Sequence, residues 1–196
     1  MNSSEDIPPQ LLKILENGVD RGAERLAKIS RTNWIIQTVS VRLAQMSRVA
    51  AMAENEGTDY GIFLSMEGGG FLVVFPEAEA KAMASAFLTQ TEWEKPGSRM
   101  EEMALSEIAN VVANAIADLL ADACGRAVFL AAPVAERKKA VDLLRELPKR
   151  FPAAGAQTLL VYAHMSSSSL SADCMVAIIL DDDWQKALLT VAEAGK

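Results

Sequence analysis

Apolar residues are spaced in two ways along this chain, and the two spacings predict its secondary structure. Apolar positions three and four residues apart indicate amphipathic helices, whereas short runs rich in Val, Ile and aromatic residues indicate strands. Gly18 and Gly22 are expected to weaken or bend the first helix, and the glycines at 68–70 predict a hairpin turn. The predicted elements of the first half are a helix at 11–30, a strand at 33–46, strands at 61–68 and 70–75, and a helix at 76–90.

The second half of the chain repeats this order of elements. A long helix is predicted from Ser98, where Glu101 completes a capping box, to Gly125, which suits a helix C-terminus. Asp181 begins an acidic stretch that is typical of a helix N-cap, although it could also bind a cation. The other predicted elements are a strand at 127–134, a charged helix at 136–150, strands at 156–165 and 170–180, and a helix at 181–195.

A duplication would explain the repeated order. Aligning Asn17 with Asn110 places Leu26 on Leu119, and nearer the repeat ends Lys81 matches Lys186. We therefore predict a single domain over 1–196, with repeat 1 at about 8–92 and repeat 2 at about 98–196. The expected fold class is α/β (α+β): a pseudo-two-fold molecule with a mostly antiparallel sheet flanked by helices. The charged helix at 136–150 is interpreted as an insertion in the second copy.

The composition is that of an ordinary globular protein. Of the 196 residues, 51% are hydrophobic and 23% are charged, and the net charge is −7. This acidic balance, without a clustered basic face, argues against nucleic acid as a partner. We expect no membrane span, because no apolar run approaches the roughly 20 residues that a span requires. Since the first residues also lack the pattern of a secretory signal, a cytoplasmic location is expected.

Few side chains in this sequence are suited to the common catalytic sets. His164 is the single histidine, which makes a conventional zinc site or a histidine-based triad improbable. Cys124 and Cys174 lie far apart in apolar segments, which indicates buried and reduced thiols. If this chain is an enzyme, it therefore works without the common catalytic sets.

The helix beginning at Ser98 carries an unexpected polar stripe. At about 3.6 residues per turn, Glu107, Asn110, Asn114 and Asp118 share one face, opposite an apolar face that suits the core. Asparagine is a weak helix former, because its amide competes for nearby backbone groups. An isolated Glu-x-x-Asn pattern nevertheless often marks only a solvated helix face.

A longer pattern makes the stripe more specific. Glu107, two residues, Asn110, twenty-two residues and then Pro133 resembles the active-site signature of the CheC/CheX/FliY family of chemotaxis phosphatases, and most resembles CheC. Met103 stands where that family usually has Asp or Ser. In the first repeat, Ile14 replaces the glutamate and Ser40 replaces the proline, so we interpret that copy as a degenerate site.

The resemblance implies a phosphatase of phosphorylated CheY-like response regulators. In that role Asn110 orients the attacking water, and Glu107 anchors the regulator through a cationic residue. The regulator supplies its own Mg²⁺, so this chain is expected to need no metal ligand and no cofactor of its own. Asn114, Asp118 and Pro133 extend the partner-binding surface.

Three alternatives stay open. Asn114 and Asp118 could simply be solvated polar residues. The protein could be a non-catalytic adaptor that binds a response regulator or the deamidase CheD in chemotaxis or flagellar signalling. Finally, the Glu/Asn/Pro spacing could be accidental in an unrelated duplicated domain.

Overall fold

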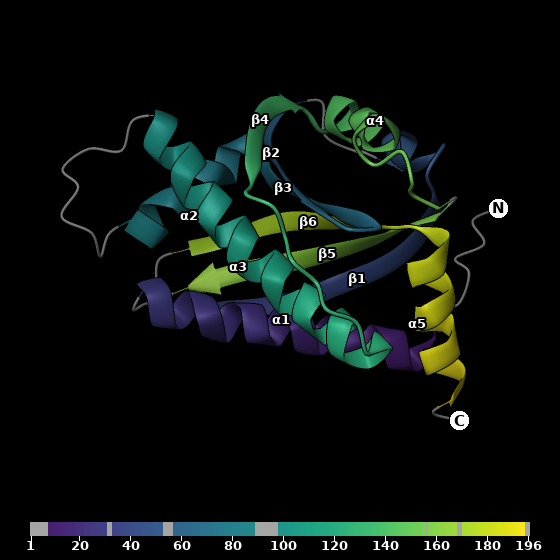
Figure 1. Ribbon diagram of the computed structural model, residues 1–196. Coiled ribbons are helices and arrows are strands. Elements are labelled where there is room, and N and C mark those ends of the chain that lie inside the picture. Colours follow the sequence, from purple (N-terminus) through teal and green to yellow (C-terminus); the bar gives the residue numbers. More distant parts are fainter. Residues whose placement is uncertain are drawn as a thin grey trace.

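One antiparallel sheet organises the fold (Figure 1). The computed structural model describes residues 8–30, 33–52, 57–88, 98–155, 157–167 and 170–194. The six strands lie in the order β1-β5-β6-β3-β2-β4, and neighbouring strands are antiparallel. The elements are α1 (Pro9–Ser30), β1 (Ile35–Gln45), η1 (Val49–Met52), β2 (Thr58–Met66), β3 (Gly69–Pro76), α2 (Glu77–Leu88), α3 (Ser98–Cys124), β4 (Val134–Lys139), α4 (Ala140–Arg150), β5 (Gln157–Ser167), β6 (Leu170–Leu180) and α5 (Asp182–Ala194).

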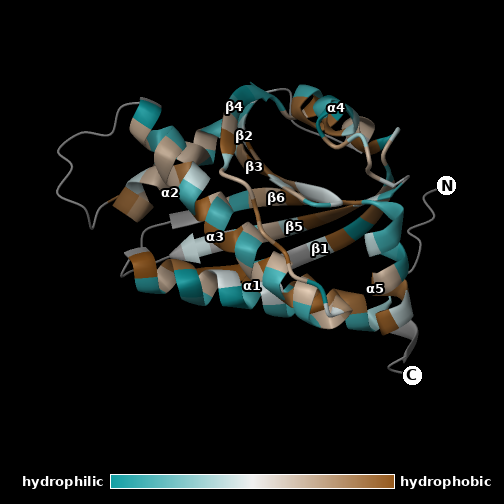
Figure 2. Ribbon diagram, viewed as in Figure 1, coloured by the Kyte–Doolittle hydropathy of each residue, from teal (hydrophilic) through white to brown (hydrophobic). Residues whose placement is uncertain are grey.

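Both faces of the sheet are buried, but by different elements. Helices α1, α2, α3 and α5 cover one face, and α4 with η1 covers the other (Figure 1). Successive residues of β2 alternate between the two cores: Ile62 and Leu64 face the larger one, and Phe63 faces the smaller one. Figure 2 shows the same division as apolar central strands between helices of mixed polarity. The predicted fold class, a mostly antiparallel sheet flanked by helices, is confirmed.

Helix α3 is the central helix of the larger core. Its residues Leu105, Ile108, Ile116 and Leu120 are fully buried. By length and composition alone the segment Arg99–Cys124 would suffice to cross a membrane, yet 61% of its most apolar window is buried in the fold. Its apolar character is therefore accounted for by packing against the sheet and the neighbouring helices. The expectation that no stretch is apolar enough for a span was too strict for this helix.

The crossing of α1 and α3 explains the two glycines of α1. A Cβ atom on Gly18 would lie 3.0 Å from the Cα of Ile116, and one on Gly22 would lie 3.4 Å from the Cα of Val112. The absence of side chains at these two positions lets the helix axes approach closely. Helix α1 runs without interruption from Pro9 to Ser30, so the glycines serve this contact and do not mark a break.

The segment after α3 differs from its prediction. The strand expected at 127–134 is irregular up to Pro133. Strand β4 occupies Val134–Lys139, and its last four residues, 136–139, fall in the predicted charged helix. Proline has no N–H for the sheet ladder, so pairing with β2 starts only at Val134. The helix itself, α4, spans Ala140–Arg150 and includes Pro148 in its last turn.

Strand β4 is hydrophilic because it is an edge strand whose side chains form ion pairs on both faces. On one face Arg137 pairs with Glu77 of α2 and lies over the Tyr60 ring, 5.4 Å from its centre. On the other face, β4 joins α4 through the pairs Glu136–Arg150 and Lys138–Glu146. Strand β4 therefore forms the edge of the sheet, and the charged helix α4 covers the second face.

Local turn and cap chemistry agrees with the sequence. Gly68 adopts φ = 77° in the turn between β2 and β3, a conformation that glycine reaches without strain. The Oδ1 of Asp181 accepts the Trp184 backbone N–H at 2.8 Å, which confirms the expected N-cap of α5. Helix α3 starts at Ser98 as predicted, but the Ser98 side chain of the capping box lies outside the described part.

The strand order has an internal symmetry. Exchanging β1, β2 and β3 with β4, β5 and β6 leaves the order unchanged when the sheet is read from its other edge. Each half contributes a hairpin, β2–β3 or β5–β6, and one strand that pairs with the other half's hairpin. A duplicated chain folding around a two-fold axis would produce this order, and we propose that the two predicted repeats arose in this way.

Candidate functional site

The polar stripe of α3 lies on the side of the helix that the sheet does not cover. Glu107 is exposed, whereas Asn110, Asn114 and Asp118 are half-buried. The adjacent residue Ile108 is fully buried, because the apolar positions of α3 face the core. A long, well-packed helix thus holds the four polar side chains on one rigid surface.

The two asparagines of the stripe are joined by hydrogen bonds. The Nδ2 of Asn114 donates to the Oδ1 of Asn110 at 2.9 Å and to the backbone oxygen of Asn110 at 2.8 Å. These bonds span one helical turn, the spacing at which side chains of a helix meet. The side-chain amide of Asn110 is therefore fixed by a hydrogen bond from the next turn of its own helix.

Asp118 is engaged with α1. Its Oδ2 accepts a hydrogen bond from Nη2 of Arg25 at 2.6 Å, and Asp122 lies 3.9 Å from Arg21 one turn further on. The side chains of Arg25 and Asp118 are 40% and 46% exposed, so the pair remains in contact with water. The structure thus gives Asp118 a partner within the chain, which sequence reasoning did not anticipate.

Pro133 comes from the segment that returns from the end of α3 to β4. Figure 1 shows this segment running back along α3. It is attached at both ends: the Arg126 N–H donates to the Ala121 oxygen at 3.0 Å, and the Ala131 N–H donates to the Ser65 oxygen at 2.7 Å. Pro133 itself is half-buried and immediately precedes β4.

Large apolar side chains are exposed on α3 and on this return segment. Met103, one turn before Glu107 on α3, is 62% exposed. Phe129 is 85% exposed, although its neighbours Val128 and Leu130 pack against the core. The Phe129 ring is therefore available for contact with a partner that approaches the return segment.

The remaining titratable groups do not supply a catalytic set. Within the described residues, no group of three or more His, Cys, Asp or Glu side chains could hold a metal ion. The Nδ1 of His164 lies 2.6 Å from Oδ1 of Asp173, across strands β5 and β6. Burial raises the pKa of the Cys174 thiol to about 12 and also raises that of Cys124. Both thiols are therefore protonated at neutral pH and unsuited to act as nucleophiles.

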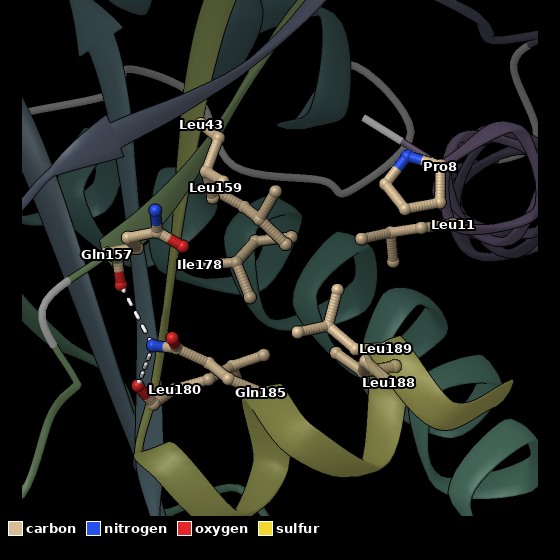
Figure 3. A pocket seen from close by; sticks show the side chains of 10 residues that line it. All are labelled: Pro8, Leu11, Leu43, Gln157, Leu159, Ile178, Leu180, Gln185, Leu188 and Leu189. Atoms are coloured by element: carbon tan, nitrogen blue, oxygen red, sulfur yellow. Dashed lines mark hydrogen bonds between the residues drawn. The ribbon is translucent and has the colours of Figure 1, made fainter. Parts of the chain in front are cut away.

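A separate cavity of about 280 Å³ lies between α1, α5 and the sheet. Figure 3 shows that it is lined by aliphatic side chains and by Gln157 and Gln185, and none of the stripe residues reaches it. The Nε2 of Gln185 is already bound to the Gln157 and Leu180 oxygens at 3.1 and 2.8 Å. With no acid or base in its lining, this cavity does not offer a second catalytic site.

The corresponding face of α1 differs from that of α3. Asn17, the equivalent of Asn110, is exposed. Ile14 occupies the position equivalent to Glu107 and supplies no carboxylate. Of the two predicted copies, only α3 therefore has a carboxylate three residues before the amide; on α1 the exposed Asp20 lies three residues after Asn17 instead.

Comparison with known proteins finds solved structures with the same fold. No protein-family model matches the sequence, and neither does any curated protein. Among solved structures, FliY of Thermotoga maritima superposes with a TM-score of 0.72 at 16% identity, covering 100% of this chain and 99% of that chain. The FliM middle domain of H. pylori gives 0.64 at 12% identity, covering 94% and 99%. CheX from Desulfovibrio desulfuricans gives 0.54 at 13% identity, covering 86% and 99%.

These similarities concern the fold. The chain has the architecture shared by FliY, FliM and CheX over nearly its whole length, and the resemblance to the CheC/CheX/FliY family is confirmed at that level. Function lies in the site that a fold carries, so the activity has to be argued from the residues of α3.

Proposed function

We propose that this protein is a cytoplasmic phosphatase that hydrolyses the aspartyl phosphate of a CheY-like response regulator in chemotaxis signalling. The observation that carries the proposal is the pair of Glu107, which is exposed, and Asn110, which is half-buried, on the face of α3 that the sheet does not cover. It lies on a fold that this chain shares with CheX and FliY. Pro133, at the spacing expected from the resemblance, lies just before β4.

The chemistry of an acyl phosphate suits this site. The leaving group is a carboxylate, so hydrolysis needs little help from a general acid. The requirement is to hold a water in line with the phosphorus and to stabilise the charge on the phosphoryl oxygens. An asparagine amide is neutral at physiological pH and both donates and accepts hydrogen bonds. Asn110 is suited to orient such a water when α3 enters the acidic pocket of the regulator.

Glu107 is suited to docking. Its carboxylate is exposed one turn from Asn110, and within the described residues it forms no ion pair. A cationic side chain of the regulator would complete the pair and fix the approach of Asn110 to the phosphoryl group. A hydrogen bond between two oppositely charged groups is shorter and stronger than a hydrogen bond between neutral groups.

The Mg²⁺ in this proposal belongs to the regulator. It would neutralise the phosphoryl oxygens from the regulator's side, while α3 approaches from the other side. This chain contributes the amide and the anchoring carboxylate and provides no metal ligand.

A second candidate is an adaptor that binds the regulator, or CheD, without catalysis. Met103 favours it, because an exposed apolar side chain stands where the resemblance expects a small polar one. The fold is also that of the FliM middle domain, and one solved neighbour is a FliG–FliM complex from H. pylori with a TM-score of 0.58.

The loss of radiolabelled phosphate from a phosphorylated regulator separates the two candidates. The reaction is followed without added protein, with the wild type, with Glu107→Ala combined with Asn110→Ala, and with Asn17→Ala. Asn17 is the matched control, because it is exposed on α1 at the equivalent position. Acceleration that only the double variant loses supports the phosphatase. Binding without acceleration supports the adaptor. A protein that neither binds the regulator nor accelerates the loss of phosphate overturns the phosphatase and the regulator-binding adaptor.

A further inference from the structure

We infer that Asn114 is a positioning residue, which fixes the orientation of the Asn110 amide and does not itself meet the partner. This inference rests on the proposed function, in which Asn110 is the catalytic residue. It revises the expectation that Asn114 extends the partner-binding surface.

The polarity of the Asn114 amide follows from its two acceptors. One acceptor is the backbone oxygen of Asn110, at 2.8 Å, which cannot donate a hydrogen bond. The end of Asn114 that faces it must therefore be Nδ2, whichever way an amide would otherwise be assigned. The same Nδ2 lies 2.9 Å from the Asn110 side-chain oxygen, so its two hydrogens serve two acceptors on one residue.

The orientation of Asn110 follows in turn. Because Asn114 presents a donor, the Oδ1 of Asn110 faces Asn114 and the Nδ2 of Asn110 faces away from it. Oδ1 retains a second lone pair, and Nδ2 retains its two hydrogens. A water held by that lone pair and a phosphoryl oxygen held by Nδ2 would lie side by side. The donor bond from Asn114 also polarises the Asn110 amide, which makes its N–H groups better donors.

A purely structural role would need only the hydrogen bond from Asn114 to the Asn110 backbone oxygen. A polar side chain that bonds the carbonyl four residues earlier is common in helices, and it slightly weakens them. The bond to the Asn110 side chain adds nothing to the helix, but it removes the free rotation of the amide. Both hydrogens of Asn114 are occupied, so little of its donor capacity is left for a partner.

Two substitutions at this position separate the roles. Asn114→Ala removes the donor and replaces asparagine by the best helix former, so folding is retained. Asn114→Asp keeps the shape but presents only acceptors, which favours the reversed orientation of the Asn110 amide. Asn17→Ala is the matched control on α1. Turnover of a phosphorylated CheY-like regulator gives kcat and KM, and ¹⁵N relaxation of the Asn110 side-chain amide reports its order.

Both variants are expected to lose kcat by on the order of 10- to 100-fold, because misplacing a reacting group costs rates of this size. KM should change less than twofold in Asn114→Ala, since the docking residues are intact. The order parameter of the Asn110 amide should fall below about 0.6, the range of flexible groups, in Asn114→Ala.

The outcomes that would overturn the inference are distinct from those that would overturn the proposed function. An Asn110 amide that is equally ordered in the wild type and in Asn114→Ala excludes positioning, whatever the turnover. A raised KM with unchanged kcat would return Asn114 to the docking surface. A wild type without phosphatase activity overturns the proposed function, and Asn114 then positions no catalytic residue.

Discussion

Arg25 and Asp118 form a hydrogen-bonded ion pair at 2.6 Å, and they occupy equivalent positions in the two predicted repeats. They are 93 residues apart, which is also the separation that aligns Asn17 with Asn110. A position and its two-fold equivalent can touch only near the axis that relates them. The α1–α3 crossing therefore contains the axis on the helical side of the molecule.

The sheet shows a second contact of this kind. Leu72 of β3 pairs with Ala177 of β6 in the middle of the sheet. Their separation equals the one that aligns Lys81 with Lys186 in the sequence. The two contacts together define a pseudo-two-fold axis that runs from the centre of the sheet through the helix pair. They support the proposed duplication independently of residue identity.

The Arg25–Asp118 pair should contribute little stability. Both side chains are substantially exposed, so water and salt screen their attraction, and exposed pairs of this kind are worth about 0.2–1 kcal/mol. A double-mutant cycle with Arg25→Ala and Asp118→Ala, measured by urea unfolding, should give a coupling energy in that range. The exchanged pair Arg25→Asp with Asp118→Arg should recover most of it. A coupling above about 2 kcal/mol would show that the pair is essential to the helix crossing.

The close approach of α1 to α3 should be sensitive to side-chain size. Gly18→Val places side-chain atoms against the Ile116 backbone, which must move, and we expect a loss of about 1–3 kcal/mol in the free energy of unfolding. Gly22→Ala is the control. There the added methyl group meets Val112 at 3.4 Å, and the gain in helix propensity of about 1 kcal/mol offsets the crowding. Equal effects of the two substitutions in thermal unfolding would contradict the packing described.

Sequence patterns predicted most of this fold because most of its elements have one clear period. The hairpin at Gly68, the N-cap at Asp181 and the core face of α3 follow from local chemistry. Strand β4 was missed because its side chains are charged, and the partner of Arg137 on α2, Glu77, is distant in sequence. The charged residues Glu136, Arg137 and Lys138 give no alternation of apolar and polar positions from which a strand could be recognised.

The candidate site was predictable only in part. Glu107 and Asn110 stood out because polar residues repeat on one face of an apolar helix. The bond between Asn114 and Asn110 requires side-chain conformations, which spacing alone does not determine. The pairing of Asp118 with Arg25 depends on how α1 crosses α3, and that crossing depends on Gly18 and Gly22.

Cys174 should make stability fall at high pH. Burial raises its pKa to about 12 in the folded state, from an ordinary value of 9.0. Between these values the unfolded chain loses a proton that the folded chain keeps, so the free energy of unfolding decreases as the pH rises. The stability that the buried, protonated thiol allows is fully present below about pH 9 and is lost as the pH rises towards 12. Unfolding in urea across this range should show a steeper decline for the wild type than for Cys174→Ala, and parallel curves would contradict the burial.

Phe129 should contribute to binding and not to stability. Its side chain is 85% exposed on the segment that runs back along α3 (Figure 1), so Phe129→Ala should change the free energy of unfolding by less than about 0.5 kcal/mol. If the regulator docks on α3, loss of this aromatic contact should weaken binding several-fold in titration calorimetry. Ile35→Ala, exposed by 55% on strand β1, is the control and should bind normally. Unchanged affinity for Phe129→Ala would place the regulator away from this segment.

The most direct test of the account is a single substitution, Asn110→Ala, with turnover and binding measured on the same phosphorylated regulator. The account predicts that the variant binds the regulator as tightly as the wild type does but no longer accelerates the loss of phosphate. Undiminished acceleration would contradict it, because the water would then be oriented by another group.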